Sequence, residues 1–179
     1  MTTRKEDRME SISTRRITRS GLIAAIYVAV TISLSAFSYG GIQFRVAEAL
    51  MLLCLFSKDH IFSLSLGCFI ANIYSTVGVI DTVIGTSATL FAAVCIYYLR
   101  DHLNLVTASV FPILFNAVLV GLELRFLTGA PLLLSMGGVA LGEFVCVTVF
   151  GGILFKILKQ HQSFMRLMGD EIDDRTARK

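Results

Sequence analysis

An arginine and a glutamate three residues apart introduce a long apolar stretch of this chain. Arg45 and Glu48 stand just before the run Leu50–Phe56. Ionisable side chains are costly inside a bilayer, so they usually face a protein interior or a wet cavity and serve a function there. At this spacing the two side chains share one helical face, where they partly neutralise each other and still present polar atoms inward. The pair predicts a buried polar site.

The composition indicates a membrane protein. Of the 179 residues, 55% are hydrophobic and 16% are charged, and the charged residues gather near the two ends. A soluble domain has about a quarter charged residues. The apolar segment that follows the basic start is too long for the core of a secretory signal peptide. We expect a basic cytoplasmic tail over 1–19, one membrane domain over 20–159 and a charged cytoplasmic tail over 160–179.

Apolar segments predict an all-α bundle of six transmembrane helices. Each approaches the roughly 17–25 residues needed to cross the hydrocarbon layer, the second only if Arg45 and Glu48 are counted. Basic residues concentrate in the tails and after the second and fourth segments, which places both termini in the cytoplasm and the protein in the cell membrane. The predicted segments are 20–38, 42–57, 61–78, 82–99, 105–123 and 137–158.

This topology brings most of the remaining ionisable side chains toward the outer side of the membrane. Four carboxylates and two guanidinium groups there carry a formal charge of −2. Asn72 and Asn116 lie deeper, and Asn116 shares a helical face with Glu123. Polar side chains also hold transmembrane helices together, but convergence from separate segments favours a polar cavity. The charged set is Arg45, Arg125, Glu48, Asp81, Glu123 and Glu143.

Several classes of site find no support in the sequence. It contains no P-loop for ATP hydrolysis, no HExxH or GxSxG motif, and no spacing typical of a metal site. The four cysteines lie in apolar segments and are expected as core residues. The three histidines are expected on the cytoplasmic side. Neither a cysteine nor a histidine is therefore expected to reach the polar cluster. We expect no catalytic residue, metal, cofactor or nucleic acid. If the protein moves a solute uphill, the energy would come from a partner.

Small residues recur at every fourth position of the first segment. Gly21, Ala25, Ala29 and Ser33 form a smooth strip along which another helix can approach closely. The strip fits a partner protein or packing within the same bundle, and the residues alone leave this choice open. Similar strips are assigned to internal packing, at Gly85, Thr89 and Ala93 and at Gly138 and Gly142.

Short motifs that follow one another along most of the hydrophobic chain are similar to those of a known family. They are GIQFRVAEAL at 41–50, LGCFIANI at 66–73, DTVIGT at 81–86, Phe115-Asn116, Glu123-Leu124 and Leu141-Gly-Glu143. Together they resemble the QueT family of substrate-binding S components of energy-coupling factor (ECF) transporters. The resemblance implies a six-helix S-component fold and uptake of a queuosine precursor, a 7-deazaguanine.

The same resemblance implies partner proteins. An S component depends on a separate transmembrane coupling subunit and on two cytoplasmic ATPases, so ATP would be used by the partner subunits only. The pair Ala25-x-x-x-Ala29 matches the alanine motif with which S components dock on the coupling subunit.

The polar residues suit the edges of a 7-deazaguanine. Its ring N–H and exocyclic amine are adjacent donors for one carboxylate, and its carbonyl needs a donor. The negative cluster favours an aminomethyl precursor, which is a cation, over a cyano precursor. Carboxylate candidates are Glu48, Glu123 and Glu143; donor candidates are Asn72, Asn116, Gln43 and Arg45; a ledge for the flat ring is offered by Tyr39, Phe44 and Tyr74.

Two outer loops, Tyr39–Phe44 and Leu127–Met136, contain glycines and are expected to close over bound substrate as a gate. Other readings stay open beside the transport of a 7-deazaguanine. One is an S component for a riboflavin-like or pyridoxine-like vitamin. Another is a protein outside transport, either a small intramembrane enzyme or a membrane assembly factor.

Overall fold

The computed structural model describes residues 3–38, 43–75 and 78–161, with side chains from residue 14 onward except that of Phe37. Within these ranges the chain is helical and contains no strand. Three of the described elements depart from the α form: η1 and the short η2 are 3₁₀ helices, and η3 is a π-helix. The elements are α1 Thr3–Ser33, α2 Ser35–Ser38, η1 Val46–Leu55, α3 Asp59–Ile73, α4 Val79–Leu99, η2 Arg100–His102, α5 Leu105–Thr128, α6 Leu132–Glu143, η3 Phe144–Gly151 and α7 Gly152–Leu158.

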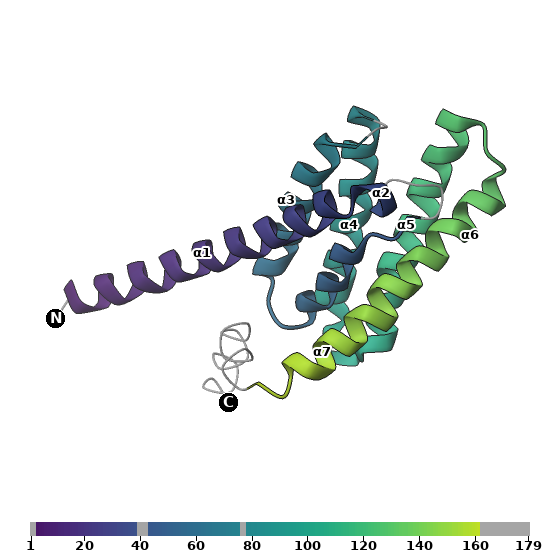
Figure 1. The fold of residues 1–179 in the computed structure, drawn as a ribbon. Helices are drawn as coiled ribbons and strands as arrows, with labels where there is room; N and C mark the ends of the chain where they lie inside the picture. Colours follow the sequence, from purple (N-terminus) through teal and green to yellow (C-terminus); the bar gives the residue numbers. More distant parts are fainter. Residues whose placement is uncertain (1–2, 39–42, 76–77, 162–179) are drawn as a thin grey trace.

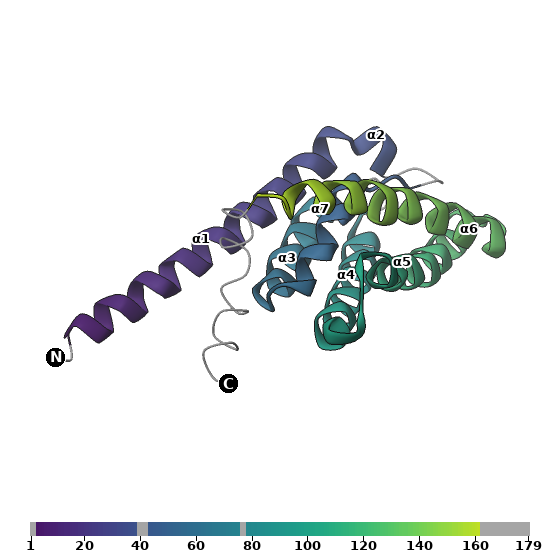
Figure 2. The same cartoon turned by 90° about the horizontal axis from the view of Figure 1, so that it is seen from below.

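The helices form one bundle around η1. Figure 1 shows α1 crossing the body and projecting from it at its N-terminal end, and Figure 2 shows α3, α4 and α5 side by side beneath α1 and the continuous α6–η3–α7 rod. The short η1 contacts α1, α3, α4, α5 and η3. Because these elements surround η1, seven of its ten residues are buried, Glu48 among them.

The six predicted segments correspond to helices, but two of them are shorter than predicted. Only four helices within the described residues are long and apolar enough to cross a membrane: Thr14–Ser33, Val79–His102, Leu105–Thr128 and Leu132–Leu158. The segment predicted at 42–57 is a ten-residue 3₁₀ helix, which is about 20 Å long at 2.0 Å per residue. The segment predicted at 61–78 ends at Ile73. The described residues therefore contain four helices of spanning length and two shorter apolar helices, and the crossing of the membrane by all six segments stays a prediction.

Close backbone contact holds η1 and the residues before it against the α6–η3 rod. A Cβ atom at Gly142 would lie 2.0 Å from the carbonyl oxygen of Gln43, and one at Gly151 would lie 3.2 Å from the carbonyl oxygen of Ala49. Only a glycine leaves room for such an approach. These contacts confirm that Gly142 serves internal packing, as do the buried Gly85, Thr89 and Ala93.

Replacing Gly142 by alanine is expected to destabilise the protein by about 1–3 kcal/mol, because the added methyl group forces the 43–46 backbone away from α6. The measurement is the thermal unfolding midpoint in detergent. Gly137→Ala is the matched control, since a Cβ atom there meets nothing within 4 Å. Equal midpoints for the two variants would contradict the close packing of this segment.

The connection between α5 and α6 is shorter than predicted. The α5 helix continues to Thr128 and ends at Gly129, whose φ of 72° lies in the left-handed region, which glycine adopts without strain. The α6 helix begins at Leu132. The predicted gate loop Leu127–Met136 is therefore corrected to the short connection 129–131. Most of the other predicted gate, Tyr39 included, lies outside the described residues.

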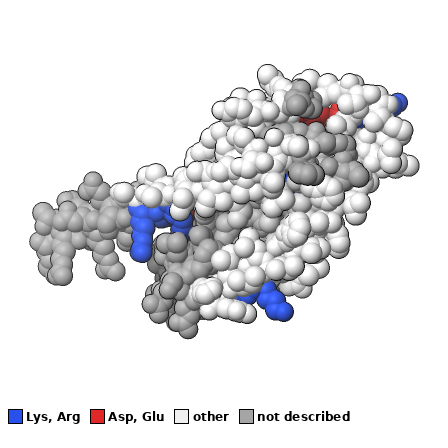
Figure 3. Space-filling model, in the orientation of Figure 1, with Lys and Arg blue, Asp and Glu red and all other residues white. Residues whose placement is uncertain are grey.

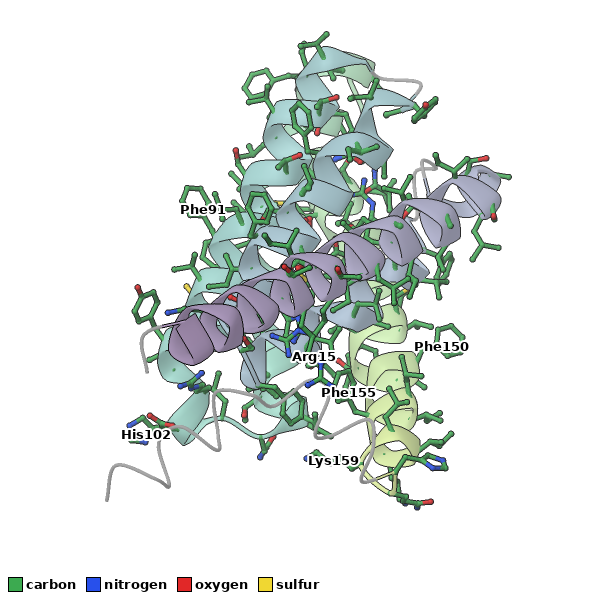
Figure 4. The ribbon with its side chains drawn as sticks, turned by 90° about the vertical axis from the view of Figure 1, so that its left-hand side faces the viewer. Arg15, Phe91, His102, Phe150, Phe155 and Lys159 are labelled. Carbon is green, nitrogen blue, oxygen red and sulfur yellow. The ribbon has the colours of Figure 1, made fainter. Side chains whose placement is uncertain are left out.

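The outer surface of the bundle is apolar between its two ends. Phe91 and Phe150, on α4 and η3, point outward on opposite sides in Figure 4 and are about half exposed. Such exposure suits a surface covered by lipid. At the lower end of the same view lie His102 and Lys159, and Figure 3 shows further basic side chains along α1 and at the lower edge. Most of the basic side chains in these two views thus gather at one end of the bundle.

An ion pair fixes α1 to α3 at this basic end. Arg16 donates through Nε and Nη2 to the two carboxylate oxygens of Asp59, at 2.7 and 2.6 Å. Arg19 donates to the same carboxylate at 3.0 Å. The hydrogen bonds from Arg16 hold the pKa of Asp59 below its ordinary value. Both arginines contact this carboxylate, so α1 is held at a defined place against α3.

Candidate functional site

Most of the predicted site residues are buried in the half of the bundle opposite the basic end. They come from the residues just before η1 and its first turn, the last turn of α3, the first turn of α4, the middle and C-terminal half of α5 and the end of α6. Asp81 lies in the first turn of α4, although the sequence placed it in a connection. Each of the following is at most 5% exposed: Gln43, Arg45, Glu48, Asn72, Asp81, Asn116, Glu123 and Glu143.

Arg45 is the cation of this cluster. Its Nη2 atom lies 4.0 Å from Oδ1 of Asp81, and its Nη1 atom lies 3.8 Å from Sγ of Cys68. Its charge also acts on Glu48, Glu123 and Glu143. Arg45 therefore connects the carboxylates of η1, α4, α5 and α6 into one electrostatic group.

Two hydroxyl groups that were not among the predicted site residues hold Glu48. The Tyr27 hydroxyl, from α1, donates to Oε1 of Glu48. The Thr89 hydroxyl, from α4, lies 3.1 Å from the same oxygen. Tyr27 and Thr89 are both fully buried. In the sequence they stand in apolar helices without any charge to mark them, so only the structure reveals their role.

Asn72 and Gly85 bring α3 and α4 together within the cluster. Asn72 donates through Nδ2 to the backbone carbonyl of Asp81 at 3.3 Å. A Cβ atom at Gly85 would lie 2.6 Å from that nitrogen and 3.3 Å from the Asp81 carboxylate. The absence of a side chain at Gly85 thus makes room for the amide and the carboxylate.

Cys68 also belongs to the cluster, which corrects the expectation that no cysteine reaches it. Its sulfur lies 3.4 Å from Nδ2 of Asn72 and 3.2 Å from the Thr89 hydroxyl. Cys68 lies about one helical turn before Asn72 on α3. The two side chains therefore face the same interior. All four cysteines are free. Among the described residues, no group of His, Cys, Asp or Glu is arranged to hold a metal ion.

Several buried polar atoms of the cluster have no hydrogen-bond partner among the described residues. They include one oxygen of Glu48, one of Glu143, both of Glu123 and the amide nitrogen of Asn116. Buried polar atoms are normally satisfied, since leaving one unpaired costs about 1–3 kcal/mol. The cluster therefore offers mainly acceptor atoms, with a donor at Asn116, to a bound molecule.

The charge of the cluster is more negative than predicted. Arg125, which the sequence analysis counted within it, is exposed on α5 and donates to the backbone carbonyl of Gly129 at 2.8 Å. Four buried carboxylates and the single guanidinium of Arg45 then give a formal charge of −3 if all are ionised. Such a charge is costly to bury without a compensating cation.

The aromatic residues predicted as a ledge are not gathered at the cluster. Tyr74 is the residue directly after α3 and is 66% exposed. Phe44 is half-buried beside Arg45. Tyr39 lies outside the described residues. Of the predicted ledge, Phe44 alone is described next to the cluster, and the buried ring that the structure adds is Tyr27.

Comparison with known proteins identifies the family of this chain. Residues 17–160 match the family model described as QueT transporter. The chain is 34% identical over 165 residues to a protein of Lactococcus lactis subsp. cremoris (strain MG1363) named queuosine precursor transporter QueT. The alignment covers 85% of this chain and 97% of that protein. No solved structure matches the chain. Because these matches cover most of its length, this chain belongs to the QueT transporter family.

Proposed function

We propose that this protein is the substrate-binding S component of an ECF uptake transporter and that it binds a 7-deazaguanine precursor of queuosine in the buried acidic cluster. The relative from Lactococcus lactis is named for transport of a queuosine precursor. The observation that carries the proposal is the set of buried carboxylate oxygens without a partner among the described residues. Such atoms are the acceptors that a donor-rich heterocycle needs.

The geometry of the cluster supports binding through Glu48 or Glu143. Each retains one oxygen without a described partner, and both are at most 1% exposed. The ring N–H and the exocyclic amine of a deazaguanine are adjacent donors, which suits a carboxylate. The free amide nitrogen of Asn116 can donate to the carbonyl of the ring. Hydrogen bonds to ionised groups are stronger than those between neutral groups.

The charge of the cluster supports the aminomethyl precursor over the cyano precursor. An aminomethyl group is a cation near neutral pH, whereas a nitrile is neutral. The cluster holds four carboxylates and one guanidinium, and a buried charge is stabilised by a nearby charge of opposite sign. A cationic ligand would therefore compensate part of the excess negative charge when it binds.

The first helix supports docking of a partner. Gly21, Ala25, Ala29 and Ser33 are all exposed along α1, so the strip is not used for packing inside the described bundle. Small residues on an exposed membrane helix allow another helix to approach closely. The partner that we propose is the ECF coupling subunit, which with its two ATPases would supply the energy for uptake.

An apolar groove next to the strip enlarges this docking surface. It has a volume of about 440 Å³ and runs between α1 and the η3–α7 segment over η1. Ile26 and Val30 line it from α1, each one residue along the helix from Ala25 or Ala29. The groove therefore flanks the strip on α1, and we propose that an apolar helix of the coupling subunit covers both.

Calorimetry on the purified protein in detergent tests the ligand. We expect 7-aminomethyl-7-deazaguanine to bind with a nanomolar to micromolar Kd, about −8 to −12 kcal/mol, and the 7-cyano analogue to bind more weakly. Riboflavin and pyridoxine are the competitors that represent other vitamins. Tighter binding of either vitamin would reject the proposed substrate. Mass spectrometry of the released ligand would show an unchanged base for a binding protein and a converted one for an enzyme.

A further inference from the structure

A chain of hydrogen bonds converges on one oxygen of Glu48. Tyr27 donates to Oε1, and Thr89 lies 3.1 Å from the same atom. The Thr89 hydroxyl also lies 3.2 Å from Cys68. A hydroxyl has one hydrogen, so when Thr89 donates to Glu48 it accepts from the thiol of Cys68. Two donors from two helices therefore hold Oε1.

The second oxygen of Glu48 is left for another molecule. Oε2 has no hydrogen-bond partner among the described residues, although the side chain is fully buried. Because Oε1 is held on both sides, the carboxylate cannot rotate freely, and Oε2 keeps one direction. A binding group that is held in place before the ligand arrives loses less conformational entropy on binding.

The tyrosine that holds Glu48 belongs to the helix that carries the strip. Tyr27 is fully buried, while Ala25 and Ala29, two residues to either side, are exposed on the outside of α1. Further along the same helix, Arg16 and Arg19 bind Asp59 of α3. The α1 helix thus makes polar contacts with the rest of the bundle at two places along its length. One of these contacts is with Glu48, the carboxylate proposed to bind the ligand.

We propose that the Tyr27 hydroxyl is a positioning group that fixes Glu48 for the ligand and that it thereby connects ligand occupancy to the docking face of α1. This inference rests on the proposed function. When a donor of the ligand engages Oε2, it withdraws charge from the carboxylate and weakens the bond that Oε1 accepts from Tyr27. The contact of α1 with the site then differs between the empty and the occupied protein, which is the differential interaction that coupling requires.

A double-mutant cycle tests the positioning role. Tyr27→Phe, which keeps the ring and removes the hydroxyl, is expected to weaken binding of 7-aminomethyl-7-deazaguanine about tenfold. In the Glu48→Gln background the same change is expected to cost less than about twofold, because the group it positions is already altered. Tyr98→Phe is the control, since Tyr98 is 75% exposed. Equal losses in both backgrounds, or no loss in either, would overturn the positioning role.

A fluorescent label on α1 tests the connection to the docking face. Leu22→Cys places the label on an exposed position of α1, in a Cys95→Ser background because the other cysteines are buried. Saturating ligand is expected to change the emission in the protein with Tyr27 and to change it far less with Tyr27→Phe. The same change in both would overturn the connection. If the unaltered protein binds no deazaguanine, the proposed function fails instead, and the two failures are thereby distinguished.

Discussion

Replacing Glu48 by glutamine is expected to weaken binding of 7-aminomethyl-7-deazaguanine about tenfold or more. Glutamine keeps the size of the side chain, but it removes the charge and puts an N–H₂ group where a carboxylate oxygen stood. A lost hydrogen bond to a charged group costs about 1.5–3 kcal/mol, and about 1.4 kcal/mol is a factor of ten in Kd. Calorimetry on the purified variant measures the change.

Glu143→Gln extends this experiment to the second carboxylate with a free oxygen. Glu143 is 1% exposed and comes from α6, whereas Glu48 comes from η1. At least one of the two variants is expected to lose tenfold in affinity without a change in expression. Asp101→Asn is the matched control, because it removes the same charge from an exposed position at the basic end. Unchanged affinity in both glutamate variants would show that these carboxylates only hold the helices together.

The charged part of the site could be predicted from the sequence because charge is rare in this chain. Arg45, Glu48, Asp81, Glu123 and Glu143 stand out against apolar neighbours, and burial of such groups without a purpose is costly. All five are buried in the structure. The expectation of a buried charge is wrong for Arg125, which lies near the C-terminal end of α5. Its long side chain reaches the surface there and donates to a backbone carbonyl.

The neutral part of the site could not be predicted in the same way. Tyr27, Cys68 and Thr89 are common in apolar helices, and neither their type nor their spacing marks them as polar contacts. Their proximity depends on how α1, α3 and α4 pack around η1. Packing of this kind joins residues distant in sequence, such as Tyr27 and Glu48, which are 21 residues apart.

The helical content was predictable, but the form of two helices was not. A run of apolar residues such as Val46–Leu55 predicts a buried helix without distinguishing the α from the 3₁₀ form. In the structure η1 is a 3₁₀ helix, and its Ala49 backbone lies close to Gly151 of η3. The π-helix Phe144–Gly151 follows Glu143 directly, and π-helical turns are often found at functional sites.

Placing tryptophan at Ala25 or Ala29 is expected to abolish ATP-dependent uptake and co-purification of the coupling subunit. Both residues are exposed on α1, and a bulky ring there would hold the partner helix away from the close approach that small residues allow. Ligand affinity of the isolated protein is expected to stay within a factor of about two, because neither residue faces the cluster. The measurements are uptake in vesicles with the complete transporter and calorimetry on the isolated variant.

A loss of uptake without a loss of ligand affinity would identify the strip on α1 as the docking surface. Val83→Trp serves as the control, because Val83 is 60% exposed on α4, away from the strip. A general disturbance of the membrane surface would lower uptake in the control as well. A strip that packs inside the bundle would lose ligand binding and stability together with uptake. If Ala25→Trp and Ala29→Trp assemble and transport normally, the coupling subunit must dock on another surface, and the exposed small residues of α1 would then face lipid alone.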